Sequence, residues 1–182
     1  MKPILSLPKG RLRPALATDL LELESLLHEP EVRRFLCDDK VLSRAEVEGI
    51  LAESLELDDA QLGLWVIESE ASEFAGIVGL APVSPEANVA ISMSGGTEPT
   101  VAVFPAFAGQ GRAYDAMIAV LEHAAETLKL AQLVAAVDRP NIRSHRLMKR
   151  LGFQEMGSAP GPAHELVLYR LSFISRNEGD TF

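Results

Sequence analysis

Several features that identify particular protein classes are scarce or missing in this chain of 182 residues. Cys37 is its only cysteine, so an internal disulfide and a cysteine-based metal cluster are both excluded. The four histidines, His28, His123, His145 and His164, are scattered without metal-ligand spacing, so no metal is predicted. The formal net charge is −9, which argues against nucleic-acid binding because neutralising phosphates requires a basic surface.

Long apolar runs are also missing. Residues 1–10 hold two lysines and a short apolar patch interrupted by Pro3 and Pro8, which does not match a signal peptide. No segment approaches transmembrane length, so we expect a cytoplasmic protein that binds no membrane. Hydrophobic residues make up 47% and charged residues 24%, as in globular domains. The length predicts one domain over 11–174, between an N-terminal extension (1–10) and a C-terminal tail (175–182).

Apolar residues recur at helical spacing in five segments, and seven other apolar segments predict strands. Thr18 is suited to cap the first helix, and Ser43 with Glu46 matches a capping box that opens the third. On the apolar face of that third helix, Ser54 is the one polar member. Residues 84–97 are interpreted as an insertion, since they fit no single element. The helices are expected at 18–27, 30–36, 43–57, 111–128 and 141–151, and the strands at 11–15, 62–68, 76–83, 98–104, 132–137, 153–156 and 164–174.

This order of elements favours one fold class. A strand, three helices and three strands are followed by a helix, a strand, a helix and two strands. The two strands at 62–68 and 76–83 are joined by a short polar connection, which indicates a hairpin. We therefore expect a mixed α/β domain with a largely antiparallel central sheet of about six to seven strands, flanked by helices.

The most informative segment is the turn from Phe107 to Ala113, between an apolar strand and a long amphipathic helix. The first amides of a helix have no acceptor within it, and the helix dipole makes that end partly positive. Gly109 and Gly111 let the backbone bend tightly and let a ligand approach without a Cβ in the way. The turn therefore predicts a seat for a phosphate or pyrophosphate, against the alternative of an ordinary tight turn.

Residue identities in the turn narrow the choice of ligand. A Walker A loop requires Lys-Ser/Thr after its last glycine, where this chain has Arg112 and Ala113. A dinucleotide-binding fingerprint requires a third glycine at the position of Tyr114. Both motifs fail, so a kinase or another nucleotide enzyme is disfavoured.

Two motifs stand in an informative order. The first is Ala108-Gly109-Gln110-Gly111-Arg112-Ala113, and the second is Asn141-x-x-Ser144 followed by Leu151-Gly152-Phe153. Together they resemble the GCN5-related N-acetyltransferase (GNAT) superfamily, most closely its RimJ/RimL-like branch, which has an Arg/Gln-x-x-Gly-x-Gly/Ala loop and then Asn-x-x-Ser and Leu-Gly-Phe. The likeness runs over residues 11–173. Three N-terminal segments share it: Leu12-Arg13-Pro14, Thr18-Asp19 and Pro30-Glu31-Val32.

The resemblance implies a GNAT-type sheet and an acetyl-CoA-dependent N-acetyltransferase. In such an enzyme a primary amine attacks acetyl-CoA directly in a ternary complex. The acceptor is a protein N-terminus or a small amine, and the negative net charge favours a cationic one. A homodimer is left open. The alternative is a non-catalytic acyl-CoA-binding or sensing domain of the same fold, because the chain departs from the family pattern at Ala108 and Met148.

The resemblance also assigns a donor site. The pantetheine arm of acetyl-CoA is expected between the strands at 98–104 and 132–137, on free main-chain groups near Val103. The amides from Gly109 to Ala113 are expected to bind the pyrophosphate. Ala108 stands where the branch usually has Arg or Gln, and Gln110 or Arg112 is a substitute to be tested. The expected cofactor-binding residues are Val101, Ala102, Val103, Ala108, Gly109, Gln110, Gly111, Arg112, Ala113, Asn141 and Ser144.

Glu98 is the candidate general base. It precedes Pro105 by seven residues, like a glutamate in related sequences of the branch, and a carboxylate at a strand entrance can accept an amine proton directly or through water. The alternative is a solvated glutamate at an exposed strand start.

The candidate hydrogen-bond donor to the CoA sulfur or pantetheine is Ser144. Many members of the superfamily place a tyrosine where this chain has Met148, whose thioether donates no proton. Ser144 lies one helical turn earlier on the same side, while water or the amine is the alternative proton source. Asn141 either caps its helix or binds pantetheine. A basic cluster either meets the adenosine 3′-phosphate or is a solvated helix face: Arg139, Arg143, Arg146, Lys149 and Arg150.

Overall fold

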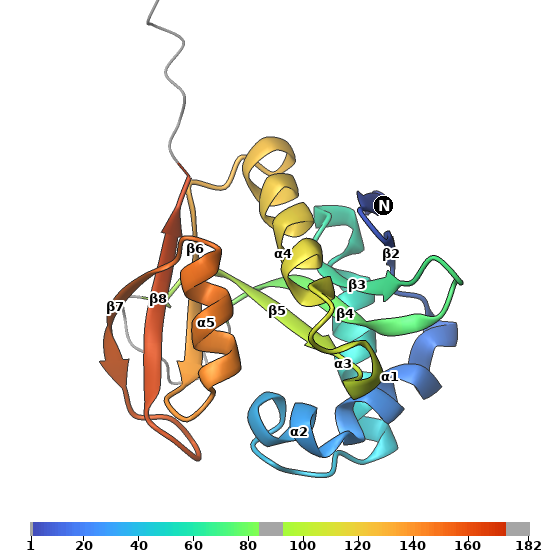
Figure 1. Cartoon of the computed structure of the whole chain (residues 1–182), viewed down its shortest axis with the longest axis horizontal. Helices are drawn as coiled ribbons and strands as arrows, with labels where there is room; N and C mark the ends of the chain where they lie inside the picture. Colours follow the sequence, from blue (N-terminus) through green and yellow to red (C-terminus); the bar gives the residue numbers. More distant parts are fainter. Residues whose placement is uncertain (1, 84–92, 174–182) are drawn as a thin grey trace, which may run out of the picture.

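The computed structural model describes residues 2–83 and 93–173, which form eight strands and five α-helices (Figure 1). The strands form two sheets, in the spatial orders β1-β2-β3-β4-β5 and β6-β8-β7, and all neighbouring strands are antiparallel. The strands are β1 (Leu5–Leu7), β2 (Gly10–Pro14), β3 (Gly63–Glu68), β4 (Phe74–Pro82), β5 (Thr97–Val103), β6 (Gln132–Asp138), β7 (Gln154–Ala159) and β8 (Leu166–Ser172). The helices are α1 (Leu20–His28), α2 (Pro30–Leu36), α3 (Arg44–Glu56), α4 (Arg112–Glu122) and α5 (Ile142–Arg150).

The predicted mixed α/β class is confirmed, including the hairpin of β3 and β4. The sheet differs in two respects from the expectation. β1 adds an eighth strand because Leu5 pairs with Leu12 of β2. The strands also divide into two sheets, since no strand pairing joins β5 to β6 in the described part of the chain. Most of the predicted insertion (84–92) and the predicted tail at 175–182 lie outside the described residues.

Two predicted helix caps have different outcomes. The Ser43–Glu46 capping box is confirmed, since the Ser43 main-chain N–H donates to the Glu46 carboxylate at 2.7 Å and Ser43 Oγ accepts from the Glu46 main-chain N–H at 3.4 Å. The cap at Thr18 is wrong. A 3-10 turn precedes α1, and the Asp19 carboxylate accepts the Leu16 main-chain N–H at 2.8 Å, which fixes the start of that turn.

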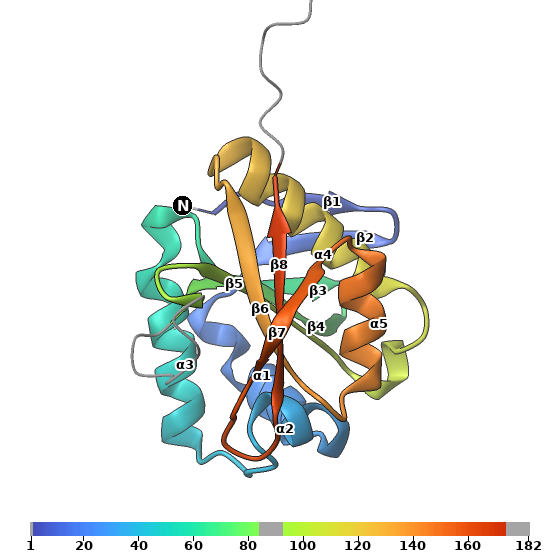
Figure 2. The same ribbon diagram turned by 90° about the vertical axis from the view of Figure 1, so that its left-hand side faces the viewer.

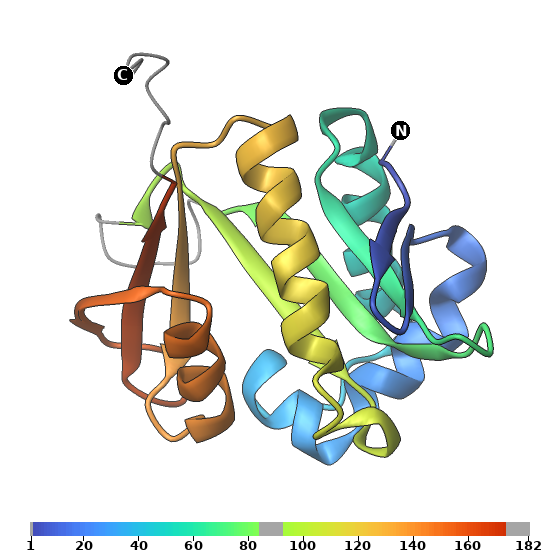
Figure 3. The ribbon, with the colours of Figure 1, turned by 45° about the horizontal axis from the view of Figure 1, so that its top comes forward.

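Helices cover both faces of the five-stranded sheet (Figures 1 and 3). α4 packs Met117 against one face, in a core that contains the fully buried Trp65. α1, α2 and α3 pack on the opposite face, where Leu26 belongs to a second core with Val66 and Ile77. In the three-stranded sheet β8 lies between β6 and β7, with α5 alongside (Figure 1), and Figure 2 views this sheet from the side of β7. None of the helices in the described residues is long and apolar enough to cross a membrane.

The division between the sheets positions the site. β5 begins beside β6, and the two strands then diverge toward the carboxyl end of β5 (Figures 1 and 3). The turn from Pro105 to Gly111 follows β5 and leads directly into α4, while the end of β6 leads into α5. The N-terminal ends of α4 and α5 and the diverging strands β5 and β6 therefore border one region.

Candidate active site

A groove of about 1630 Å³ follows the divergence of β5 and β6. Its walls come from α2, β5, the turn before α4, the first turns of α4, the end of β6, and α5. The structure thus brings together both predicted catalytic residues, Glu98 and Ser144, and the predicted cofactor-binding residues, with the exception of Gln110. The phosphate seat, the proton acceptor and the strand edges that the sequence suggested separately belong to a single space.

The main chain of β5 offers free groups at alternate residues. The Phe104 N–H donates to the Ala75 carbonyl of β4 at 2.9 Å. Main-chain groups of successive strand residues point to opposite sides of the strand. Val101 and Val103 therefore turn their N–H and C=O groups toward the groove, whereas Ala102, also predicted to bind the cofactor, turns its groups toward β4. Pro99 has no N–H and lies on the same open edge as Val101, where a strand tolerates proline.

The same alternation applies to β6. The Arg139 N–H donates to the Glu165 carbonyl at 2.8 Å, so the odd-numbered residues pair with β8 and the even-numbered residues face β5. The Ala136 N–H accordingly points into the division, where it donates to Glu98 Oε1 at 2.8 Å. This side-chain contact joins β5 to β6 across the division.

Glu98 is half-buried, so it is not the solvated glutamate that the alternative required. Burial raises the pKa of its carboxyl group, because the ionised form is poorly solvated, and the hydrogen bond from Ala136 partly opposes that rise. A carboxylate with a raised pKa is a better proton acceptor than a solvated one.

The turn before α4 presents unpaired amides. Gly109 and Gly111 adopt left-handed φ values of 73° and 82°, and an added Cβ at Gly109 would meet nothing within 4 Å. The first hydrogen bond of α4 runs from the Asp115 N–H to the Gly111 carbonyl at 3.0 Å. The N–H groups of Arg112 to Tyr114 thus have no helical acceptor, and no side chain of the described residues caps the helix. This arrangement fits an anion.

The polar side chains of the turn hold the turn itself. Gln110 Nε2 donates to the Ala106 carbonyl at 3.0 Å. Arg112 donates to the Lys9 carbonyl at 3.0 Å, and its guanidinium lies 5.2 Å from the centre of the Phe107 ring. Both side chains thus make contacts within the turn, and a role for either in place of the missing Arg or Gln at position 108 stays a prediction. The main-chain amides are further donors that this turn offers to an anion.

On α5 the capping role of Asn141 is confirmed, while pantetheine binding by this residue stays a prediction. Its Oδ1 accepts the Ser144 main-chain N–H at 3.2 Å. The Ser144 hydroxyl is half-buried in the groove and has no hydrogen-bond partner within residues 2–83 and 93–173. Met148, one turn later, is 5% exposed and belongs to the core under α4. Ser144 therefore presents a hydroxyl to the groove from α5.

Most of the basic cluster already has partners. Arg139 pairs with Glu165, Arg143 pairs with Glu31 of α2, and Arg150 lies 3.7 Å from the centre of the Tyr114 ring. Arg146 lines the groove as an exposed side chain. The cluster is thus largely the paired helix face of the alternative, and Arg146 is the member best placed for a phosphate.

Sequence reasoning missed the wall that α2 contributes and the carboxylate at the end of β6. Phe35 and the loop after α2 line the groove, as does Asp138. Asp138 is only 8% exposed, although aspartate is rarely buried without a partner. An acidic residue that directly follows a predicted apolar strand was the available signal.

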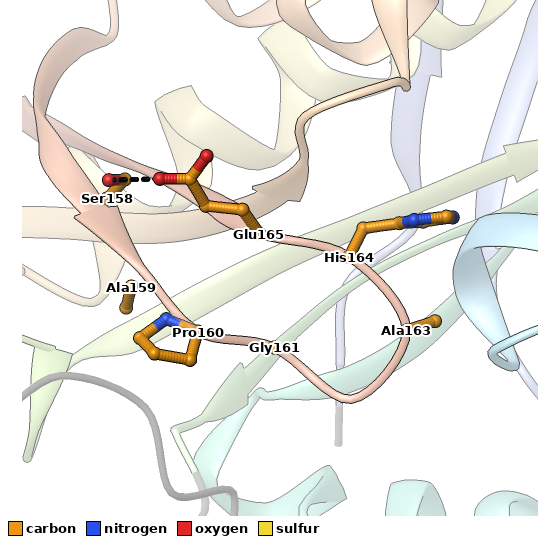
Figure 4. Close-up of a pocket in the computed structure, with 7 residues that line it drawn as sticks. All are labelled: Ser158, Ala159, Pro160, Gly161, Ala163, His164 and Glu165. Atoms are coloured by element: carbon orange, nitrogen blue, oxygen red, sulfur yellow. Dashed lines mark hydrogen bonds between the residues drawn. The ribbon is translucent and has the colours of Figure 1, made fainter.

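A smaller hollow of about 460 Å³ lies in the loop between β7 and β8 (Figure 4). Ser158 donates to the Glu165 carboxylate at 2.7 Å, and Glu165 also pairs with Arg139. Hydrogen bonds from Arg139 and Ser158 lower the pKa of Glu165, so this carboxylate stays ionised and engaged. In Figure 4 the His164 side chain points away from Glu165, and its ring lies 6.4 Å from that of Phe35.

Comparison with known proteins agrees with this geometry. A family model described as the Acetyltransferase (GNAT) domain matches residues 11–154. A protein assigned to the GnaT acetyltransferase family from Bordetella pertussis superposes with a TM-score of 0.81 at 21% identity, over 93% of this chain and 99% of that one. RimL, a ribosomal L7/L12 alpha-N-protein acetyltransferase in complex with coenzyme A, gives 0.76 at 18%, over 93% and 98%. A ribosomal-protein-alanine N-acetyltransferase from Brucella melitensis gives 0.70 at 20%, over 89% and 99%. At these identities the solved structures show a common fold.

Proposed function

Because the chain belongs to the GNAT acetyltransferase family, we propose that it transfers the acetyl group of acetyl-CoA to a primary amine. The observation that carries this proposal is the composition of the groove. Free turn amides, the open main-chain edge of β5 and the Glu98 carboxylate all border one space. The RimL likeness suggests a protein N-terminus as acceptor, and a small amine is the other candidate. A cytoplasmic location, a homodimer and a single domain over 11–174 stay predictions.

The chain's own residues provide the contacts that the donor requires. Acetyl-CoA supplies a thioester carbonyl that is already activated toward amines. The N–H groups of Arg112 to Tyr114 bind its pyrophosphate, with the partly positive end of α4 favouring the negative charge. Val101 and Val103 present N–H and C=O groups to the two amides of pantetheine, as a neighbouring strand would. The Ser144 hydroxyl is available to hydrogen-bond the sulfur or the pantetheine arm.

The proposed reaction balances without a further reactant. The amine nitrogen bonds to the acetyl carbon, the carbon–sulfur bond breaks, and the proton that nitrogen loses passes to the departing sulfur directly or through Glu98 and water. The main-chain N–H of Val101 or Val103 stabilises the negative charge that develops on the carbonyl oxygen. Glu98 must be ionised to accept the proton, and its raised pKa makes it a stronger base than an exposed glutamate.

The proposal is tested by calorimetry with CoA and by acetyl transfer to a panel of amines. Glu98→Gln should lower kcat by about 100-fold or more, the range for loss of a general base, and should leave the Kd of CoA unchanged. Glu126→Gln, at an exposed position after α4, is the control with the same change of charge. Folded protein that releases no heat with CoA would overturn the proposal. Tight CoA binding with transfer to no amine would favour the acyl-CoA-sensing alternative.

A further inference from the structure

Glu98 and Asp138 point to the same face of the two sheets. On β5, Val103 packs with the α4 core, whereas Ala102 packs with the core of α1 to α3. Glu98 alternates with Ala102, so its side chain lies on the α1–α3 face. On β6, Val137 belongs to the α4 core, and Asp138 therefore turns to the opposite face, which is that of Glu98. The two carboxylates border the groove on the side away from α4, where α2 forms the wall.

The Asp138 side chain is largely buried, and its charged neighbours are His164 and Asp38. It is 8% exposed and lines the groove, and it has no hydrogen bond or ion pair among the described residues. Burial raises its pKa, which His164 of the β7–β8 loop lowers and Asp38, in the loop after α2, raises further. His145 faces this residue too, but its Nε2 lies 3.1 Å from the Asp138 main-chain oxygen. A buried carboxylate is stabilised when a cation reaches it.

Other charges along the α2 wall largely cancel. Glu31 pairs with Arg143, and Asp39 pairs with Arg33 at 3.0 Å. Arg34 stacks over the Phe35 ring, 5.0 Å from its centre, and keeps its positive charge. Among the described residues, three carboxylates, those of Glu98, Asp138 and Asp38, then stand against the one guanidinium of Arg34 on this side of the groove. The α2 side therefore keeps a negative charge that attracts a cationic acceptor.

We infer that the acceptor is a small diamine, and that Asp138 binds the ammonium group that is not acetylated while the reacting amine lies at Glu98. This inference rests on the proposed function and names its substrate class. The Glu98 carboxylate is held at the Ala136 N–H of β6, and Asp138 follows Ala136 by two residues along β6. Two residues of a strand span about 6.6 Å, so a diaminoalkane whose nitrogen atoms are about 6–7 Å apart matches both positions. A monoamine leaves Asp138 without its partner.

The experiment compares kcat/KM for a homologous series of diaminoalkanes, for monoamines of equal carbon number, and for a tripeptide with a free N-terminus and no cationic side chain. The native protein should favour the best diamine by about tenfold or more, which is the value of one charge-assisted hydrogen bond. Asp138→Asn should lose this preference, chiefly through a higher KM for the diamine. Asp39→Asn removes a charge that Arg33 already meets and should keep the preference.

Equal use of diamine, monoamine and tripeptide by the native protein would overturn the inference, and that comparison needs no variant. A diamine preference that survives in Asp138→Asn would overturn the role of Asp138. These outcomes differ from failure of the proposed function, in which CoA is not bound or no amine of any kind is acetylated.

Discussion

Replacing Gly111 with aspartate should weaken CoA binding far more than replacing it with asparagine. Both side chains have the same size, and both tolerate the left-handed conformation that Gly111 adopts, with φ of 82°. An added Cβ there would meet only Asp115 Oδ2, at 3.9 Å, so either side chain fits. The two variants therefore differ mainly in one negative charge beside the free amides of α4.

The magnitude follows from Coulomb's law. Two unit charges 4 Å apart interact by about 1 kcal/mol in water and by about 4 kcal/mol at the effective dielectric constant of a protein surface. A repulsion in this range corresponds to a loss of about fivefold to several hundredfold in Kd for each charge pair. We expect the aspartate variant to bind CoA at least about tenfold more weakly than the asparagine variant. A carboxylate at a helix N-terminus favours the helix, but it would also lie near the Asp115 carboxylate, so the stability of both variants must be measured beside their CoA affinity.

Calorimetry at low salt, with melting temperatures recorded for both variants, provides the measurement. Equal CoA affinities in the two folded variants would refute the assignment of the pyrophosphate to the start of α4. A difference that shrinks as salt is added would support it, because exposed charges are screened.

Three further outcomes follow from buried polar groups. Burial raises the pKa of Glu98, so activity should be full above that pKa and should fall as the pH drops through it. Glu98→Gln should flatten this acidic limb of the pH profile of kcat/KM. An acidic limb that is unchanged in this variant would assign the titration to another group. Burial lowers the pKa of His123 in the folded protein. In the unfolded chain the pKa of a histidine is about 6.5, so below that pH the unfolded chain binds more protons than the folded protein. Stability should then fall as the pH decreases through that value, and urea unfolding of His123→Phe should show a smaller loss than the native protein. The Ser54 hydroxyl accepts the Leu64 N–H at 2.7 Å. Ser54→Ala should therefore reduce the free energy of unfolding by about 1–3 kcal/mol and leave the Kd of CoA unchanged. A stability equal to that of the native protein would contradict a role for this hydrogen bond.

The course of the helices could be predicted because their signals are local. The stripe of α4 is buried as its spacing indicates. On α3 the same spacing was right in part. It placed Ser54 on the face that is buried, where Ser54 is 4% exposed, but Ile50 and Leu55, placed on the same face, are each 37% exposed. Ser54 is buried because its hydroxyl accepts the Leu64 N–H at the start of β3. That contact depends on where a strand from another part of the chain lies, which helical periodicity does not contain.

The candidate site could be predicted only in part for a similar reason. The turn at Gly109 and Gly111 and the position of Glu98 follow from motif and order along the chain. Which of Val101, Ala102 and Val103 turns its main-chain groups toward the groove depends on the register of β5 with β4. Pro99 carried that information, because a proline within a strand indicates which alternate residues face an open edge. The burial of Asp138 depends on α2 and the β7–β8 loop, which no motif connects to β6.

The proposed general-base role of Glu98 can be separated experimentally from its contact across the divided sheet. Within residues 2–83 and 93–173 the division leaves main-chain groups on both strand edges without strand partners, and Glu98 meets one of them, the Ala136 N–H. Glutamine retains an oxygen that can accept this N–H but has no useful basicity, whereas alanine has neither property. Glu98→Gln and Glu98→Ala should therefore lose kcat to a similar extent, while only the alanine variant should lose about 1–3 kcal/mol of stability from the unsatisfied buried donor. If the glutamine variant kept its kcat and alanine alone reduced it, Glu98 would act by holding β5 to β6, and the proton would have to leave by another route.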